Sequence, residues 1–228
     1  MKTIVAKFQA VGGPARSSMG GDGYSMGPTD SGQFVIAYCS KHSSRRYAEW
    51  SKIKWGTPLK EENGQLFIKF QGQWKLLKNY TSVTKDQIKQ YHRQLYGTAK
   101  IPTQWVFNDF GHMTCYYFKD INKNRKLDKS AGERVHGEFI HTTPTDEANT
   151  RLGLPVFLTE SHGCVHVKPA DIDIMIEKGY LRKGNLFIVH KYNEAAPTVA
   201  GGGNAKPPYE VHFYPGSRQI VVKGTAIK

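Results

Sequence analysis

The sequence predicts a mainly β domain of the α+β class, with two or three short helices and a C-terminal β-hairpin. Short runs rich in β-branched and aromatic residues recur along the chain, and Gly, Pro or polar residues separate them, as is typical of strands. Only two segments carry clear start and stop signals of a helix. With 228 residues, of which 39% are hydrophobic, the chain is long enough for one domain with a substantial core.

Strand character begins near the N-terminus and returns at intervals along the chain. Residues 12–32 interrupt it, because their Gly, Ser, Met and Pro content favours a loop. Gln71-Gly72-Gln73 is typical of a hairpin turn between two of the runs. The runs in which we expect strands are residues 3–8, 33–39, 66–70, 74–77, 105–107, 112–118, 138–141 and 186–190.

Two helices are expected, over residues 84–96 and 169–178. Thr84 is a good N-cap for the first helix, and Gly97 is a typical stop. Pro169 suits the first position of the second helix.

A change in composition separates the C-terminal part from the rest of the chain. Residues 193–208 contain three consecutive glycines and two consecutive prolines, which is typical of a flexible linker. Two further strand-like runs flank Pro215-Gly216-Ser217. We therefore expect a main domain at residues 1–192, a linker at residues 193–208 and a β-hairpin at residues 209–228.

The chain is strongly basic, with 32 Lys and Arg residues against 19 Asp and Glu and a formal charge of +13. This charge favours anionic partners such as nucleic acid, membrane headgroups or an acidic wall polymer. Cations interleave with Tyr47, Trp50 and Trp55 in residues 41–60, a pattern that single-stranded nucleic acid can use. No helix-turn-helix, zinc-finger or RNA-recognition motif accompanies it. We interpret the stretch as a solvated basic face and expect no nucleic-acid partner.

No stretch of the sequence approaches the roughly 18 apolar residues of a membrane span, so we expect none. Near the N-terminus, Lys7 and Gln9 interrupt the apolar run before the core of a secretory signal peptide forms. We therefore expect no cleavable export signal. The alternatives are residence in the cytoplasm, export by another route, or a trimmed chain.

The chain has three cysteines, Cys39, Cys115 and Cys164. An odd count fits a catalytic or free thiol beside at most one disulfide. Cys39 and Cys115 lie in apolar, strand-like runs, where we expect small buried core residues. A disulfide between them is the alternative in an oxidising compartment, and the sequence leaves that choice open.

The run Ser161-His162-Gly163-Cys164 has the chemistry of a nucleophilic site. Cys164 shortly precedes the second expected helix, and a helix N-terminus with a neighbouring imidazole favours the reactive thiolate. The N–H groups of Gly163 and Cys164 are candidates for an oxyanion hole. His141 ends an expected strand and is the candidate base, which completes the minimum for acyl transfer.

The same residues allow interpretations other than catalysis. A lone Cys is usually a core residue, and a lone His is often structural, but their combination here favours an active site. His162, Cys164 and His166 share one face of an extended segment and offer ligands for zinc. Zinc sites usually take their ligands from separate turns. We therefore favour a thiol nucleophile and expect neither a metal nor a cofactor.

A short segment has part of the pattern of a calcium-binding loop. Arg125 replaces the usual Gly of such loops, and Ala131 replaces the final Glu. Asp and Asn are also common in ordinary turns, so a plain hairpin loop is the preferred interpretation. The residues at loop positions 1, 3, 5 and 9 are Asp120, Asn122, Asn124 and Asp128.

Gly137-Glu138-Phe139-Ile140-His141, followed by a loop and Ser161-His162-Gly163-Cys164-Val165, resembles the signature of the YkuD family of L,D-transpeptidase catalytic domains. That signature is a histidine, a variable spacer and Ser/Thr-His-Gly-Cys. Gly27-Pro28-Thr29-Asp30-Ser31-Gly32-Gln33-Phe34 is similar to the family's Thr-Pro-x-Gly-x-Phe segment, with altered spacing. The resemblance covers residues 24–192 and implies a YkuD-like β-sandwich or barrel, with residues 1–192 as the catalytic domain.

The resemblance implies a role for each matching residue. Cys164 would attack the carbonyl of the third residue of a peptidoglycan tetrapeptide stem and expel the terminal D-alanine. His141 would be the base, with the Thr142 carbonyl as its orienter. The acyl group would then pass to an amine or to water. The pocket and oxyanion hole would consist of Ser161, Gly163, the Cys164 N–H and His162, the third candidate catalytic residue.

The sequence departs from the family pattern in three places. His166 stands two positions after the cysteine, where Arg or Asn is usual. Because His titrates near neutrality, substrate binding by His166 is expected to depend on pH. The spacer between His141 and Ser161 is longer than usual, and a large insertion lies between Cys39 and Trp105. We expect a different lid and a reshaped substrate groove.

These features predict a cysteine acyltransferase or peptidase of the L,D-transpeptidase type that acts on peptidoglycan stem peptides in the periplasm or cell wall. Without an export signal, an antibacterial effector delivered by a type VI-like secretion apparatus is a candidate, and such a toxin implies an immunity protein. One alternative is a cysteine hydrolase or acyltransferase that acts on another peptide or protein. Another is a non-catalytic module that binds the anionic cell wall.

Overall fold

The computed structural model describes every residue except 22, 45–47 and 228. Tyr47, part of the basic and aromatic stretch, therefore lies outside the described residues. Contacts divide the chain into two compact units, each of which is described by itself. Unit 1 comprises Met1–Cys39, Cys115–His141 and Leu158–Lys228, and unit 2 comprises Ser40–Thr114 and Thr142–Phe157.

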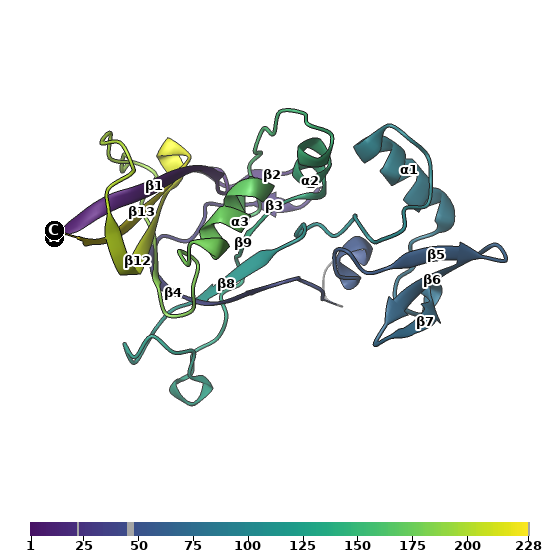
Figure 1. The fold of residues 1–228 in the computed structure, drawn as a ribbon, viewed down its shortest axis with the longest axis horizontal. Helices are drawn as coiled ribbons and strands as arrows, with labels where there is room; N and C mark the ends of the chain where they lie inside the picture. Colours follow the sequence, from purple (N-terminus) through teal and green to yellow (C-terminus); the bar gives the residue numbers. More distant parts are fainter. Residues whose placement is uncertain (22, 45–47, 228) are drawn as a thin grey trace. The chain divides into compact units, whose positions relative to one another are not determined.

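Unit 1 is built around a closed barrel of eight strands, which confirms the mainly β prediction (Figure 1). Tyr117, Phe187 and Phe213 are among the large side chains that are fully buried in it. The strands lie in the order β1, β10, β9, β8, β4, β11, β12, β13 around the barrel. A separate small hairpin of β2, Ser18–Met19, and β3, Ser25–Met26, lies in the expected loop. The bounds of the barrel strands are β1 Lys2–Val11, β4 Gly32–Ser40, β8 Thr114–Phe118, β9 Ile140–His141, β10 Val165–Val167, β11 Leu186–Val189, β12 Ala205–Tyr214 and β13 Gln219–Ala226.

The C-terminal hairpin is present and forms part of the barrel wall. β12 and β13 pair with each other, and β13 pairs with β1 (Figure 1). β12 also pairs in parallel with β11. Residues 205–208, expected in the linker, belong to β12. The hairpin therefore covers two strands whose edges would otherwise be unpaired.

The glycines before β12 pack against β1 rather than merely providing flexibility. The N–H groups of Gly202 and Gly203 donate to the carbonyls of Val5 and Ile4 at 3.1 and 3.0 Å. A Cβ atom on Gly203 would lie 2.5 Å from the Thr3 hydroxyl oxygen. A side chain at this position would collide with the Thr3 side chain, so the packing favours glycine.

Cys39 and Cys115 form a disulfide, with their Cα atoms 4.0 Å apart. The two residues lie near the end of β4 and the start of β8. They enclose residues 40–114, which make up most of unit 2. For a sequence separation of 76 residues, loss of entropy in the unfolded chain stabilises the fold by about 4 kcal/mol. The disulfide therefore fastens both ends of a long insertion to adjacent strands of the barrel.

Unit 2 contains a three-stranded antiparallel sheet and two helices. Its core includes Ile88, Trp105 and Phe107, all fully buried. The two expected strands joined by Gln71-Gly72-Gln73 are confirmed. Residues 105–107 are not a strand, because Trp105 bonds through its backbone to the turn at residues 56–57. The elements are η1 Glu49–Lys52, β5 Leu59–Glu62, β6 Gln65–Phe70, β7 Gln73–Leu76, η2 Leu77–Asn79, α1 Lys85–Tyr96 and α2 Pro144–Arg151.

Both expected helices are confirmed. Thr84 and Gln87 form a capping box at the start of α1, and Gly97 ends it with a left-handed φ of 74°. The second is α3, Pro169–Glu177, in unit 1. A third helix, α2, was not among the two expected; it begins with Pro144, and the Thr143 side chain caps it. Over the described residues, no helix has both the length and the apolar character needed to cross a membrane.

Candidate active site

Two paired strands lie at the candidate nucleophile and base. Cys164 immediately precedes β10, and His141 ends β9. These strands are parallel, with Val165 opposite Ile140 and His166 opposite His141. The His141 and His166 rings meet edge to face, with their centroids 4.8 Å apart. Alternate residues of a strand share a face, so we expect Cys164, which directly precedes β10, on the same face as His166 and His141.

The thiol of Cys164 is free and partly buried. The Phe139 N–H donates to its Sγ at 3.3 Å. Burial raises the pKa of the Cys164 thiol to about 12; the Phe139 N–H opposes this shift, and the charge of Glu138 adds to it. The expectation of a thiolate at a helix N-terminus is wrong, because β10 separates Cys164 from α3 at Pro169. The resting group is a neutral thiol.

Ser161 holds the turn that precedes the nucleophile. Its buried Oγ accepts the Gly163 N–H at 3.0 Å and donates to the Cys164 carbonyl. Its own N–H donates to the Gly12 carbonyl at 3.1 Å. Because the Gly163 N–H already donates to Oγ of Ser161, it does not serve the oxyanion hole in this structure, and that prediction is wrong. The Cys164 N–H is the remaining candidate.

Gly163 meets two requirements that exclude other residues. Its φ of +125° is unfavourable for residues with a side chain. A Cβ atom at this position would also lie 2.6 Å from Oε1 of Glu138. The carboxyl group of Glu138 therefore packs directly against the backbone beside Cys164.

Glu138 belongs to a polar network that sequence reasoning did not identify. Its Oε2 accepts the Asp30 N–H at 3.1 Å and the Tyr117 hydroxyl at 3.3 Å. Burial raises the pKa of Glu138 to about 7. His136 Nε2 lies 3.2 Å from an Asp30 carboxylate oxygen. Glu138 stands inside the family motif as a polar residue in an apolar run, and that was its signal in the sequence.

Asp30, His136 and Glu138 also form a group of metal-type side chains, with ligand atoms within 4.8 Å of one another. The Glu138 N–H donates to Nδ1 of His136 at 3.2 Å. A neutral ring therefore carries its proton on Nε2, which faces Asp30. This tautomer fits a hydrogen-bonded network better than a metal ligand. In the part of the chain that the structure describes, His162, Cys164 and His166 do not form such a group.

His166 is buried and held from two sides. Its Nδ1 is bonded to the Thr159 carbonyl at 2.9 Å, so this nitrogen donates. Burial lowers the pKa of His166, which favours the neutral ring at physiological pH. Its other ring contact is with His141. These contacts favour a role for His166 in positioning His141, rather than the expected role in binding substrate.

The other predicted site residues have different surroundings. His162 is exposed beside Ser161 and Gly163, and its contribution to the pocket stays a prediction. Thr142 belongs to unit 2, where its buried hydroxyl donates to Glu147. Its carbonyl as an orienter of His141 also stays a prediction.

Glu138→Gln should make the Cys164 thiol more reactive above about pH 7, because the substitution removes a negative charge that raises the thiol pKa. A fall of half to one pKa unit would speed alkylation by iodoacetamide roughly threefold to tenfold at about pH 8.5. The alkylation rates of the wild type and of Glu138→Gln should converge at about pH 6, where Glu138 of the wild type is mostly protonated. Glu177→Gln, at the exposed end of α3, is the control. Equal alkylation rates at high pH would refute this electrostatic coupling.

The matched family model spans the barrel strands that carry this site. The YkuD model, described as the L,D-transpeptidase catalytic domain, matches residues 3–185. No curated protein and no solved structure gives a match. The matched region contains Cys164, His141 and the Ser161 turn, and it covers most of the chain. The chain therefore belongs to the YkuD family of cysteine-dependent L,D-transpeptidase catalytic domains.

Proposed function

We propose that the protein is a cysteine acyltransferase that acts on tetrapeptide stems of peptidoglycan. The observation that carries this proposal is the parallel pairing of β9 and β10. This pairing supports a free thiol and an imidazole on one face of the sheet, because Cys164 directly precedes β10 and His141 ends β9, both within the matched family region. The family acts on peptidoglycan stem peptides, which gives the substrate class.

The first half-reaction begins from a protonated thiol. His141 takes the proton from Cys164 as Sγ attacks the carbonyl of the third stem residue. The N–H of Cys164 stabilises the developing oxyanion. The tetrahedral intermediate then breaks its C–N bond, and His141 returns the proton to the leaving amine of D-alanine. The product is a thioester between the tripeptide and Cys164.

The second half-reaction releases the tripeptide from the enzyme. An amine or a water molecule attacks the thioester carbonyl and loses a proton to His141. The C–S bond breaks, and the sulfur regains a proton from His141. An amine acceptor gives a cross-link or an exchanged stem, and water gives a shortened stem.

The raised pKa of the thiol gives the base an essential part in this scheme. A cysteine that is largely ionised at neutral pH attacks without proton transfer. Cys164 is not in that state, since burial raises the pKa of its thiol to about 12. His166 and Ser161 act as positioning residues, the former for the base and the latter for the turn at the nucleophile.

The full chain should release D-alanine from purified disaccharide-tetrapeptides, with products identified by mass. Cys164→Ser should abolish release, because a hydroxyl at this position is a far weaker nucleophile. His141→Gln should lower the rate by about 100-fold or more, the usual contribution of a general base. Unchanged D-alanine release by Cys164→Ser would contradict the proposal. No release by the wild type, together with retention on wall material, would favour a binding module instead.

We further propose that the protein works in the periplasm or cell wall of a target bacterium as an antibacterial effector. The Cys39–Cys115 disulfide supports an oxidising compartment. Delivery by a specialised secretion apparatus and protection of the producer by an immunity protein are parts of this proposal.

Directing the chain to the periplasm of a susceptible bacterium tests the effector proposal. The wild type should slow growth and shorten tetrapeptide stems in the wall, whereas Cys164→Ala should do neither. Equal growth of the two strains, with both proteins present at equal levels, would argue against toxicity.

A further inference from the structure

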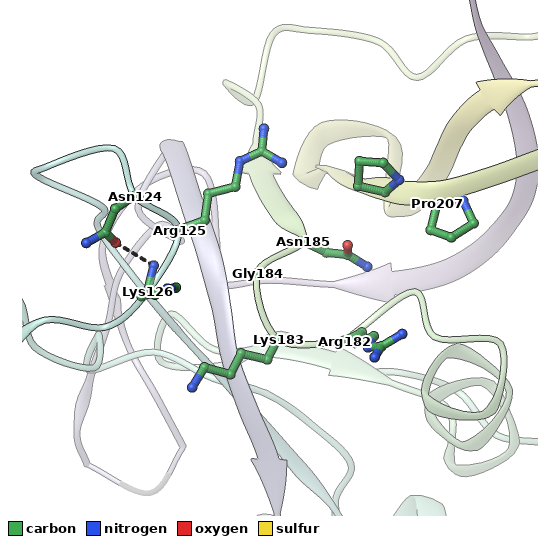
Figure 2. Close-up of a pocket in the computed structure, with 9 residues that line it drawn as sticks. Asn124, Arg125, Lys126, Arg182, Lys183, Gly184, Asn185 and Pro207 are labelled. Atoms are coloured by element: carbon green, nitrogen blue, oxygen red, sulfur yellow. Dashed lines mark hydrogen bonds between the residues drawn. The ribbon is translucent and has the colours of Figure 1, made fainter.

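A basic pocket lies in unit 1, and none of its lining residues belongs to the Cys164 site. Its volume is about 560 Å³. Figure 2 shows that it lies between the loop at residues 124–126, the turn that precedes β11 and the start of β12. Its lining residues are Asn124, Arg125, Lys126, Arg182, Lys183, Gly184, Asn185, Pro207 and Pro208.

The loop at residues 124–126 is held by its own polar side chains. Oδ1 of Asn124 accepts the Lys126 N–H at 2.7 Å, and Asp120 accepts the Arg125 N–H at 3.0 Å (Figure 2 shows the first of these bonds). The buried carboxylate of Glu133 accepts three further N–H groups of the loop. This is the segment with calcium-loop spacing, and its oxygens serve as turn acceptors. Arg125 and Lys126 therefore project from a fixed backbone.

The turn before β11 is also fixed. Asn185 is buried, and its side-chain amide donates to the carbonyls of Gly179 and Tyr180, each at 2.9 Å. The Gly184 N–H donates to the Ile36 carbonyl of β4 at 3.0 Å. Arg182 and Lys183 stand on this turn, and Figure 2 shows that their side chains extend in opposite directions, with Lys183 on the side of the loop.

The four cations of the pocket have no acidic partner. Among the residues that the structure describes, no carboxylate lies within ion-pair distance of Arg125, Lys126, Arg182 or Lys183. All four side chains are exposed. The nearby Asp120 accepts an N–H of its own loop. The pocket therefore concentrates part of the +13 charge of the chain at one place.

We propose that this pocket binds a phosphodiester polymer of the bacterial cell wall. Two arginines and two lysines on fixed turns suit successive phosphate groups, since guanidinium groups pair with phosphate through two hydrogen bonds and lysines add point charges. No aromatic residue lines the pocket, so it lacks the stacking surfaces that single-stranded nucleic acids use. The cell wall as the source of the polymer rests on the proposed action on peptidoglycan and not on the proposed effector role in a periplasm, whereas the binding of phosphodiesters rests on neither.

Such a site holds the enzyme on the wall independently of its chemistry. Occupation of the pocket raises the local concentration of stem peptides near Cys164, which adds to the affinity of the active site for a single stem. The pocket is thus a second point of attachment on the same substrate matrix.

Binding of the full chain to poly(glycerol phosphate) tests the proposal. Replacing Arg125, Lys126, Arg182 and Lys183 together by Gln should weaken binding at least tenfold and reduce the slope of log affinity against log salt by about 3. The matched control replaces four exposed lysines of unit 2, Lys54, Lys69, Lys75 and Lys78, by Gln. It removes the same charge and should weaken binding less than twofold. Cys164→Ala should bind as the wild type does.

Equal weakening by the two fourfold variants would overturn the proposal, because it would show a general charge effect. Binding of single-stranded DNA with the same number of phosphates as tightly as poly(glycerol phosphate) would overturn the choice of polymer. Failure of the wild type to bind poly(glycerol phosphate) would overturn the site itself. A catalytically inactive wild type that still binds through the pocket would refute the proposed function and leave this inference standing.

Discussion

The short parallel pairing of β9 with β10 is the contact on which the site depends. Only Ile140, His141, Val165 and His166 are in register across it. That register sets His141 beside His166 and places the Phe139 N–H on the sulfur of Cys164. A shift of one residue would turn the imidazole of the base to the opposite face. The Ser161 side chain and the Glu138 carboxyl both contact Gly163 and so hold the segment that leads into β10.

The barrel that carries this pairing is closed by segments distant in the sequence. β1 pairs with β10 at one end of its length and with β13 along most of the remainder. The C-terminal hairpin is therefore a structural part of the barrel that carries the candidate site. The disulfide has a comparable effect on the long insertion, since it joins β4 to β8 at the two points where residues 40–114 leave and return.

Local signals in the sequence predicted local structure well. The Thr84 capping box, the Gly97 stop and the turn at Gln71-Gly72-Gln73 all depend on neighbouring residues, and all are confirmed. The motif around Cys164 indicated the family for the same reason, and the family is confirmed. Contacts between distant segments could not be predicted, because one sequence does not reveal which strands pair or in which register. Glu138 against Gly163 and the hairpin in the barrel wall are of this kind. The expected direction of the shift in the thiol pKa was wrong because burial, which only the fold reveals, outweighs the hydrogen bond from the Phe139 N–H.

The buried thiol, its base and its family together lead to one central claim, that Cys164 carries an acyl group during turnover. Mass spectrometry of the protein, quenched in acid while it processes disaccharide-tetrapeptide, tests this claim directly. The account predicts an added mass equal to the substrate less D-alanine, located on the proteolytic peptide that contains Cys164 and absent from Cys164→Ala. An adduct on another residue, or release of D-alanine with no dependence on Cys164, would contradict it.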